Sequence, residues 1–233
     1  MPVRALLPLA LLVFAQPALA DERSFMVTGF ERIRVDGPYT VRVTTGGSAG
    51  ARATGDRDAL DRVSIRSEGG LLVVGSSANT TARPWNGPRA APLTIEVRVP
   101  RLFSARVFGG TLAIDRMTGP RIDLSVSGAG MISVEAIDAE RLDAAVVGTG
   151  KLSLAGRARD ARFLANGPGT IEADRLDATT LAVNAQGLGE GRFAARNTAN
   201  VSASGGGTIS VAGAATCTVR GNAAVACGKV ASE

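Results

Sequence analysis

The side chains able to do acid–base chemistry in this 233-residue chain are mostly carboxylates, because it contains no histidine. Without an imidazole, Ser-His-Asp and Cys-His nucleophiles and histidine-ligated zinc are excluded. Two pairs of aspartates could act on a glycosidic bond if stacking brought them close: Asp115 with Asp123, or Asp138 with Asp143. Both pairs lie near predicted turns and not in one recurring strand column. We therefore predict no catalytic residues and a protein that is not an enzyme.

A second possible chemistry is sugar recognition by the segment 76–92, where Arg83, Asn86 and Arg89 surround the sole tryptophan, Trp85. An exposed indole can stack on a sugar ring while polar neighbours bind its hydroxyl groups. The alternative is that Trp85 packs this segment onto the rest of the fold. These four residues form the candidate binding site, and loss of binding or loss of stability in Trp85→Ala would distinguish the two roles.

Two glycine-rich stretches resemble ligand-binding motifs but lack the residues that such motifs need. Residues 187–191 are similar to a phosphate-binding loop, yet no helical pattern follows them. Residues 205–207 resemble the turns of calcium-binding rolls, yet no aspartate occupies the positions after them. We predict no metal and no cofactor.

These stretches belong to an internal repeat marked by pairs of glycines. The first glycine of each pair falls at 128, 148, 167, 187 and 205, so the successive distances are 20, 19, 20 and 18 residues. A fixed period of this length is typical of stacked repeats. Positive φ or close backbone approach at each corner would explain the glycines. With less regular coils included at both ends, the predicted structural corner glycines are Gly37, Gly109, Gly128, Gly130, Gly148, Gly150, Gly167, Gly169, Gly187, Gly189, Gly205, Gly207 and Gly221.

Apolar residues alternate with other residues on both sides of each glycine pair, as strands do when one face is buried. Leu124 and Val126 precede the pair at 128, and Ile132 and Val134 follow it. A coil is therefore predicted as strand, glycine corner, strand and a polar connecting turn such as 136–141. Stacked coils place equivalent strands about 4.8 Å apart. The prediction is an all-β fold, a parallel β-solenoid with coils of 18–20 residues; a Greek-key sandwich is the alternative.

The connecting turns contain both apolar and acidic residues. Ile137 and Leu176 are expected to point inward. Asp138, Asp174 and Asp177 are expected to accept backbone hydrogen bonds within the turns.

The ends of the chain indicate export. Residues 1–20 combine Arg4, a short apolar stretch and a small-residue cleavage pattern, which predicts a cleaved secretory signal. Export would place Cys217 and Cys227 in an oxidising compartment, where a separation of ten residues allows a disulfide. Two buried thiols or an intermolecular bridge are the alternatives. We predict the disulfide, as a clamp on the terminal coil, whose strand edge needs protection.

After the signal, the chain is predicted to form one domain in the periplasm, the outer envelope or the medium. No later stretch is apolar enough to span a membrane. The segments 44–61 and 75–92 are predicted to interrupt the coils. The β-solenoid domain at 21–233 comprises irregular coils at 21–100, regular coils at 101–215 and a disulfide-closed cap at 216–233.

The charge pattern bears on the partners. The chain has 26 basic and 21 acidic residues, a net charge of +5. The basic residues are scattered, with no consecutive block and no interleaved aromatic residues, which argues against a nucleic-acid partner. The predicted partner is an envelope or extracellular polysaccharide, or another envelope protein.

Several segments resemble one family of bacterial envelope proteins, the auto-transporter adhesin head domain or GIN domain. They are the opening at 30–37, the strands at 71–74 and 93–100, and the repeated Ser-Gly-Ala-Gly corner at 127–130. The resemblance covers roughly residues 30–215. It implies a right-handed β-helix and an adhesin-like or structural role without catalysis. A carbohydrate-binding or carbohydrate-active β-helix is the alternative function.

Overall fold

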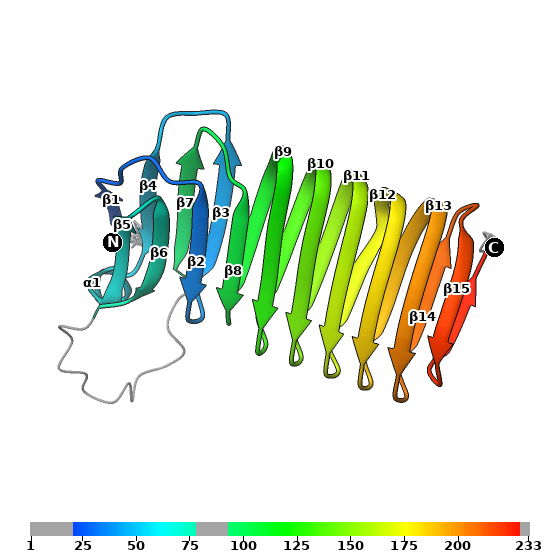
Figure 1. The fold of residues 1–233 in the computed structure, drawn as a ribbon. Coiled ribbons are helices and arrows are strands. Elements are labelled where there is room, and N and C mark those ends of the chain that lie inside the picture. Colours follow the sequence, from blue (N-terminus) through cyan, green and yellow to red (C-terminus); the bar gives the residue numbers. More distant parts are fainter. Residues whose placement is uncertain (1–20, 78–92, 229–233) are drawn as a thin grey trace, which may run out of the picture.

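The computed structural model describes residues 21–77 and 93–228, and they form a nearly all-β solenoid of about six turns. Sixteen strands join in one sheet that winds around the long axis, with the N-terminal strands at one end and the C-terminal strands at the other (Figure 1). The predicted β-solenoid is confirmed. The elements are β1 Asp21–Phe25, β2 Arg32–Asp36, β3 Thr40–Thr45, β4 Gly50–Gly55, α1 Arg57–Arg62, β5 Val63–Glu68, β6 Leu71–Ser76, β7 Thr94–Val99, β8 Ser104–Phe108, β9 Thr111–Ser127, β10 Met131–Val147, β11 Lys151–Asn166, β12 Thr170–Gln186, β13 Glu190–Ser204, β14 Thr208–Ala212, β15 Thr216–Gly221 and β16 Ala224–Cys227.

Each regular coil is one long strand that bends in its middle. β10 pairs in parallel with β9 and β11 along nearly its whole length. The prediction of a connecting turn at 136–141 is wrong, because the strand continues through this segment. The buried residues are two apart except at two intervals of three, Val134 to Ile137 and Ala139 to Leu142, which keep the inner side inward through the bend: Ile132, Val134, Ile137, Ala139, Leu142, Ala144 and Val146. Ile137 and Leu176 are buried, as expected.

The bend divides the solenoid into two faces. Face I comprises β3, β7, β14, β16 and the N-terminal halves of β9 to β13. Face II comprises β2, β6, β8, β15 and the C-terminal halves of β9 to β13. The bend leads from face I to face II within a coil, and the glycine corner leads from face II to face I of the next coil.

The two glycines of a corner are needed for different reasons. The first has positive φ, for example +111° at Gly167, a conformation that side chains with a Cβ disfavour. The second lacks positive φ but lies against the preceding coil: a Cβ at Gly169 would be 2.8 Å from the carbonyl oxygen of Gly150. The repeat therefore encodes a turn at one glycine and a close stacking contact at the other.

Columns of aliphatic side chains, one from each coil, fill the space between the faces. Ile132 and Leu152 stack in one such column. Further along the column stands Gly191, and the ring of Phe193 covers it: a Cβ at Gly191 would be 2.6 Å from that ring. The rings of Phe163 and Phe193 lie 4.9 Å apart. Among the described residues no polar or charged side chain is buried, so the core is held together by apolar packing.

The N-terminal end is closed by antiparallel strands. On face I, β7 pairs with β4 and β4 pairs with β1; on face II, β6 pairs with β5. The short helix α1 links the two faces and buries Leu60. The segment 44–61, predicted only to interrupt the coils, thus contains β4 and most of α1.

The C-terminal end is closed by a covalent bond. The predicted disulfide between Cys217 and Cys227 is present, with the two Cα atoms 6.4 Å apart. Cys217 lies beside Ala199 of the preceding coil on face II, and Cys227 lies beside Val211 on face I. The bond therefore crosses the interior of the last coil and joins the two faces.

Candidate functional site

Face II carries a shallow groove across β8, β9, β10 and β11. Its floor contains two small side chains, Ser125 and Ala145, which are partners in the β9–β10 register. In the same column Arg106 precedes them on β8 and Leu164 follows them on β11. Because the two small residues stand between larger ones, the column is hollowed in its middle.

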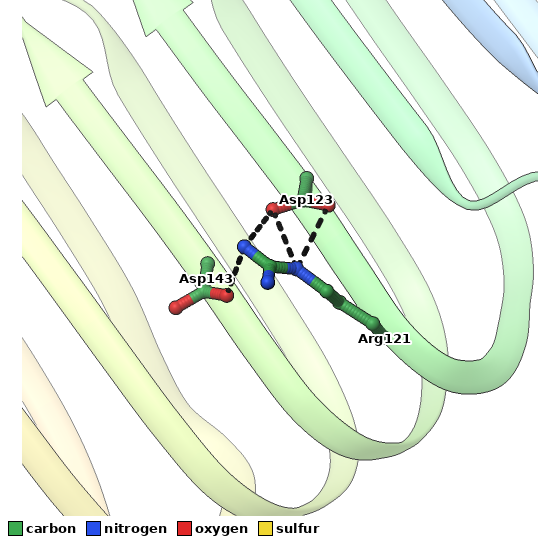
Figure 2. Close-up of polar contacts among 3 residues, drawn as sticks. All are labelled: Arg121, Asp123 and Asp143. Carbon is green, nitrogen blue, oxygen red and sulfur yellow. Dashed lines mark hydrogen bonds and ion pairs between the residues drawn. The ribbon is translucent and has the colours of Figure 1, made fainter.

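A cluster of three charged residues lies along one side of this groove. Asp123 of β9 and Asp143 of β10 are register partners. The guanidinium of Arg121 lies between their carboxylates (Figure 2), with Nη2 3.2 Å from Asp123 Oδ1 and 2.9 Å from Asp143 Oδ2. Stacking thus brings together Asp123 and Asp143. The two pairs considered from the sequence, Asp115 with Asp123 and Asp138 with Asp143, are not register partners, whereas Asp123 and Asp143, which were not considered together, share one strand column.

The electrostatics of the cluster hold its side chains in place. The pKa of Arg121 is raised, first by its hydrogen bonds to Asp123, then by the charge of Asp123 and by that of Asp143. The side chain of Asp123 keeps 45% of its surface exposed and that of Asp143 keeps 26%. Their remaining lone pairs can therefore accept hydrogen bonds from a ligand, since a carboxylate has more acceptor sites than Arg121 fills.

An exposed aromatic ring stands at the β8 wall of the groove. Phe108 lies beside Asp36 in the β2–β8 register and retains 49% of its surface. The guanidinium of Arg34 lies 5.6 Å from the ring centroid and forms an ion pair of 2.6 Å with Asp36. The ring is therefore half exposed beside hydrogen-bonding groups, and Leu164, 44% exposed, stands at the opposite wall.

The other aspartates that the sequence singled out stabilise the fold. Asp115 accepts hydrogen bonds from the backbone N–H of Thr45, at 3.0 Å, and of Arg116, at 2.6 Å. It thereby ties β9 to the end of β3. A carboxylate saturated in this way is a structural acceptor.

Two aspartates expected in turns lie in strands and pair with the next coil. Asp138 of β10 contacts Arg157 at 2.6 Å, and Asp177 of β12 contacts Arg196 at 2.9 Å. The hydrogen bond from Arg157 lowers the pKa of Asp138. The expectation of backbone hydrogen bonds in turns is wrong for both residues, because the strand does not break there. Asp174 lies exposed in β12.

The predicted binding residues Arg83, Trp85, Asn86 and Arg89 lie outside the described residues, as does the predicted signal at 1–20. Within residues 21–77 and 93–228, no group of three His, Cys, Asp or Glu side chains could hold a metal ion. In the same part of the chain, no helix has the length and hydropathy needed to cross a membrane.

Sequence reasoning missed Phe108, Arg121 and the pairing of Asp123 with Asp143. The signal was present in the repeat: Asp123 precedes Gly128 by five residues, as Asp143 precedes Gly148. Residues at the same offset from successive corner glycines become register partners. Applying the offset to polar residues, and not only to the apolar ones, would have paired these carboxylates.

Comparisons with known proteins agree with this architecture. The family model described as "Putative auto-transporter adhesin, head GIN domain" matches residues 29–215. A putative adhesin from Bacteroides fragilis has a similar structure, with a TM-score of 0.80 and 19% identity over 92% of this chain and 98% of its own. A "putative lipid binding protein" from Parabacteroides distasonis has a TM-score of 0.69 and 16% identity over 91% and 97%. No curated protein matches in sequence. At these identities the structural likenesses show the shared fold.

Proposed function

Because the chain belongs to the family of auto-transporter adhesin head GIN domains, we propose that it is a non-catalytic binding protein of the cell envelope and that it binds a surface polysaccharide in the face II groove. The groove is the observation that carries the proposal. It combines an exposed aromatic ring, Phe108, with fixed carboxylates at Asp123 and Asp143 on an open surface. Sugar rings present C–H faces for stacking and hydroxyl groups for hydrogen bonding, and the two features match these.

The rigidity of the scaffold supports binding. The groove residues stand on strands whose backbone is fixed by parallel pairing with both neighbours. Arg121 fixes the two carboxylates, and Arg34 contacts the ring of Phe108. A ligand therefore immobilises few protein side chains, which lowers the entropic cost of association.

The arrangement of the carboxylates favours binding over hydrolysis. A glycoside hydrolase needs one carboxyl group that gives a proton to the leaving oxygen, and a second that acts on the anomeric carbon or on water. In the groove, both Asp123 and Asp143 contact the same guanidinium of Arg121. Both carboxylates are thus held as acceptors by one cation, and their remaining lone pairs can accept hydrogen bonds from ligand hydroxyl groups.

The proposed location is outside the cytoplasm. The disulfide between Cys217 and Cys227 is stable in an oxidising compartment. The family and the expected signal at 1–20 agree with export.

The proposal is tested with an array of neutral and acidic polysaccharides, recording both retained protein and released reducing ends. We expect binding without product, weakened about tenfold by Phe108→Ala. The matched control is Met131→Ala, which removes an exposed side chain from face I and should leave binding unchanged. Released reducing ends would show a carbohydrate-active enzyme instead. Absence of binding to every polysaccharide would refute the proposed ligand class and point to a protein partner.

A further inference from the structure

We infer that the polysaccharide bound in the groove is acidic, and that Arg106 and Arg162 bind its anionic groups. This inference rests on the proposed function and names the ligand class of the same site. Both arginines line the groove and both are exposed. They stand at opposite walls, Arg106 on β8 and Arg162 on β11.

Among the arginines around the groove, Arg106 and Arg162 differ from Arg34 and Arg121 in their ion pairs. Arg34 is held by Asp36, and Arg121 is shared by Asp123 and Asp143. Within the described residues, in contrast, neither Arg106 nor Arg162 forms an ion pair with a carboxylate. An unpaired guanidinium offers a planar set of donors suited to two-point contact with a carboxylate or a sulfate group.

Arg162 is unpaired although it follows Asp143 in the same column. The register places Arg162 beside Asp143 on the adjacent strand, but the carboxylate of Asp143 contacts Arg121 at 2.9 Å. Asp143 is thus engaged by Arg121, which leaves the guanidinium of Arg162 available to a ligand.

The positions of the charged side chains along the solenoid axis indicate where a bound polymer would place its anionic groups. β8 and β11 are separated by three coil steps of about 4.8 Å each, so the two arginines stand on strands about 14 Å apart. Between them lie the small residues Ser125 and Ala145 and the paired carboxylates. An extended polymer can therefore place anionic groups at both walls and neutral, hydroxyl-bearing parts over the middle, where another anion would be repelled.

The net charge of the groove favours the same class. Four charged side chains line it, Arg106, Arg162, Asp123 and Asp143, and with the adjacent Arg121, which contacts both carboxylates, they sum to one positive charge. A neutral glucan would leave both outer guanidinium groups unused. A polyuronate would use them and also offer rings for Phe108 and hydroxyl groups for the carboxylates.

The test compares four probes by calorimetry or affinity electrophoresis: polygalacturonate, hyaluronate, neutral dextran and polyglutamate. We expect the two acidic polysaccharides to bind and dextran to bind at least tenfold more weakly. Arg106→Gln and Arg162→Gln should each weaken binding of polygalacturonate about tenfold, as expected when a hydrogen bond to a charged group is lost. Added salt should weaken binding of the parent protein more than binding of the double variant, which carries both Arg106→Gln and Arg162→Gln.

The matched control is Arg98→Gln, because Arg98 is an exposed arginine of β7 on face I; this variant should bind like the parent. Circular dichroism of all variants checks folding. Equal binding of dextran and polygalacturonate, or equal binding by parent and double variant, would overturn the inference while leaving the proposed function in place. Equal binding of polyglutamate and polygalacturonate would overturn it in favour of an acidic protein. Failure of every polysaccharide would refute the proposed function itself.

Discussion

Replacing the second glycine of a corner by alanine should destabilise the solenoid through crowding alone. Gly169 is the suitable position because its φ is not positive, so that alanine can adopt its backbone conformation. The added Cβ would lie 2.6 Å from Val146 Cγ1, 2.8 Å from the oxygen of Gly150 and 2.9 Å from that of Gly148. Contacts between carbon and oxygen are normally about 3.3 Å or longer, so the neighbouring coil must move by about 0.5 Å.

The magnitude follows from what that movement disturbs. The oxygen of Gly150 accepts a hydrogen bond of 2.9 Å from the backbone N–H of Thr170, and a shift of about 0.5 Å would lengthen it beyond the usual range. Weakening of this hydrogen bond should lower the free energy of unfolding by about 1 kcal/mol. Overpacking in a close-packed interior should lower it by a further amount of about 1–3 kcal/mol. The reduced freedom of alanine in the unfolded chain offsets about 0.5 kcal/mol. We expect Gly169→Ala to lower the free energy of unfolding by about 1.5–3.5 kcal/mol.

The control makes the same chemical change where no crowding exists. A Cβ added at Gly47 would meet no atom within 4 Å, and the φ of Gly47 is not positive, so Gly47→Ala should be neutral or stabilise the protein by up to about 1 kcal/mol. Urea titration followed by circular dichroism measures both variants. Amide exchange at Thr170 reports the corner directly. If the two variants unfold at the same urea concentration, the crowding argument for the second glycine is wrong.

Three further outcomes are expected. Cys227→Ala should lower stability by about 2–3 kcal/mol, the entropy of a ten-residue loop, and amide exchange should speed up in β15 and β16 but not in β9. Phe193→Ala should destabilise by about 3–5 kcal/mol in urea titration, because the ring fills buried space beside Gly191, whereas Phe193→Leu should cost less. The pKa of Glu172 is lowered, first by its hydrogen bond from Lys151, so its contribution is present above the ordinary carboxyl pKa and is lost as pH falls through the lowered value. The difference in melting temperature between parent and Glu172→Gln should therefore be largest at neutral pH and shrink as the pH falls through the lowered pKa of Glu172; a constant difference would contradict this.

The sequence predicts the repeat along the solenoid axis more clearly than it predicts the path of the chain within one coil. Corner glycines recur because two physical constraints act at each corner, as at Gly167 and Gly169. The bend in each strand has no such marker, since polar residues at 136–141 suit an outward-facing strand as well as a turn. Only the change in spacing of the buried residues, from Val134 to Ile137 and again from Ala139 to Leu142, distinguishes the two.

The candidate site needed the register, which composition does not reveal. Phe108 stands in the sequence as one of seven phenylalanines, and its exposure follows from its outward position on β8. The association of Arg121 with Asp143 joins adjacent coils. β1 was not foreseen, because its residues are exposed or half-buried and show no alternation; it forms by pairing with the edge of β4.

Stacked coils make the length of the groove a discrete quantity. Its walls stand on β8 and β11, and its floor on the two strands between them. Deleting one coil would bring the walls closer by about 4.8 Å, and duplicating one would separate them by the same amount, without altering the side chains of either wall. Gain or loss of one repeat in evolution can therefore change the length of ligand that fits the groove in steps of about 4.8 Å.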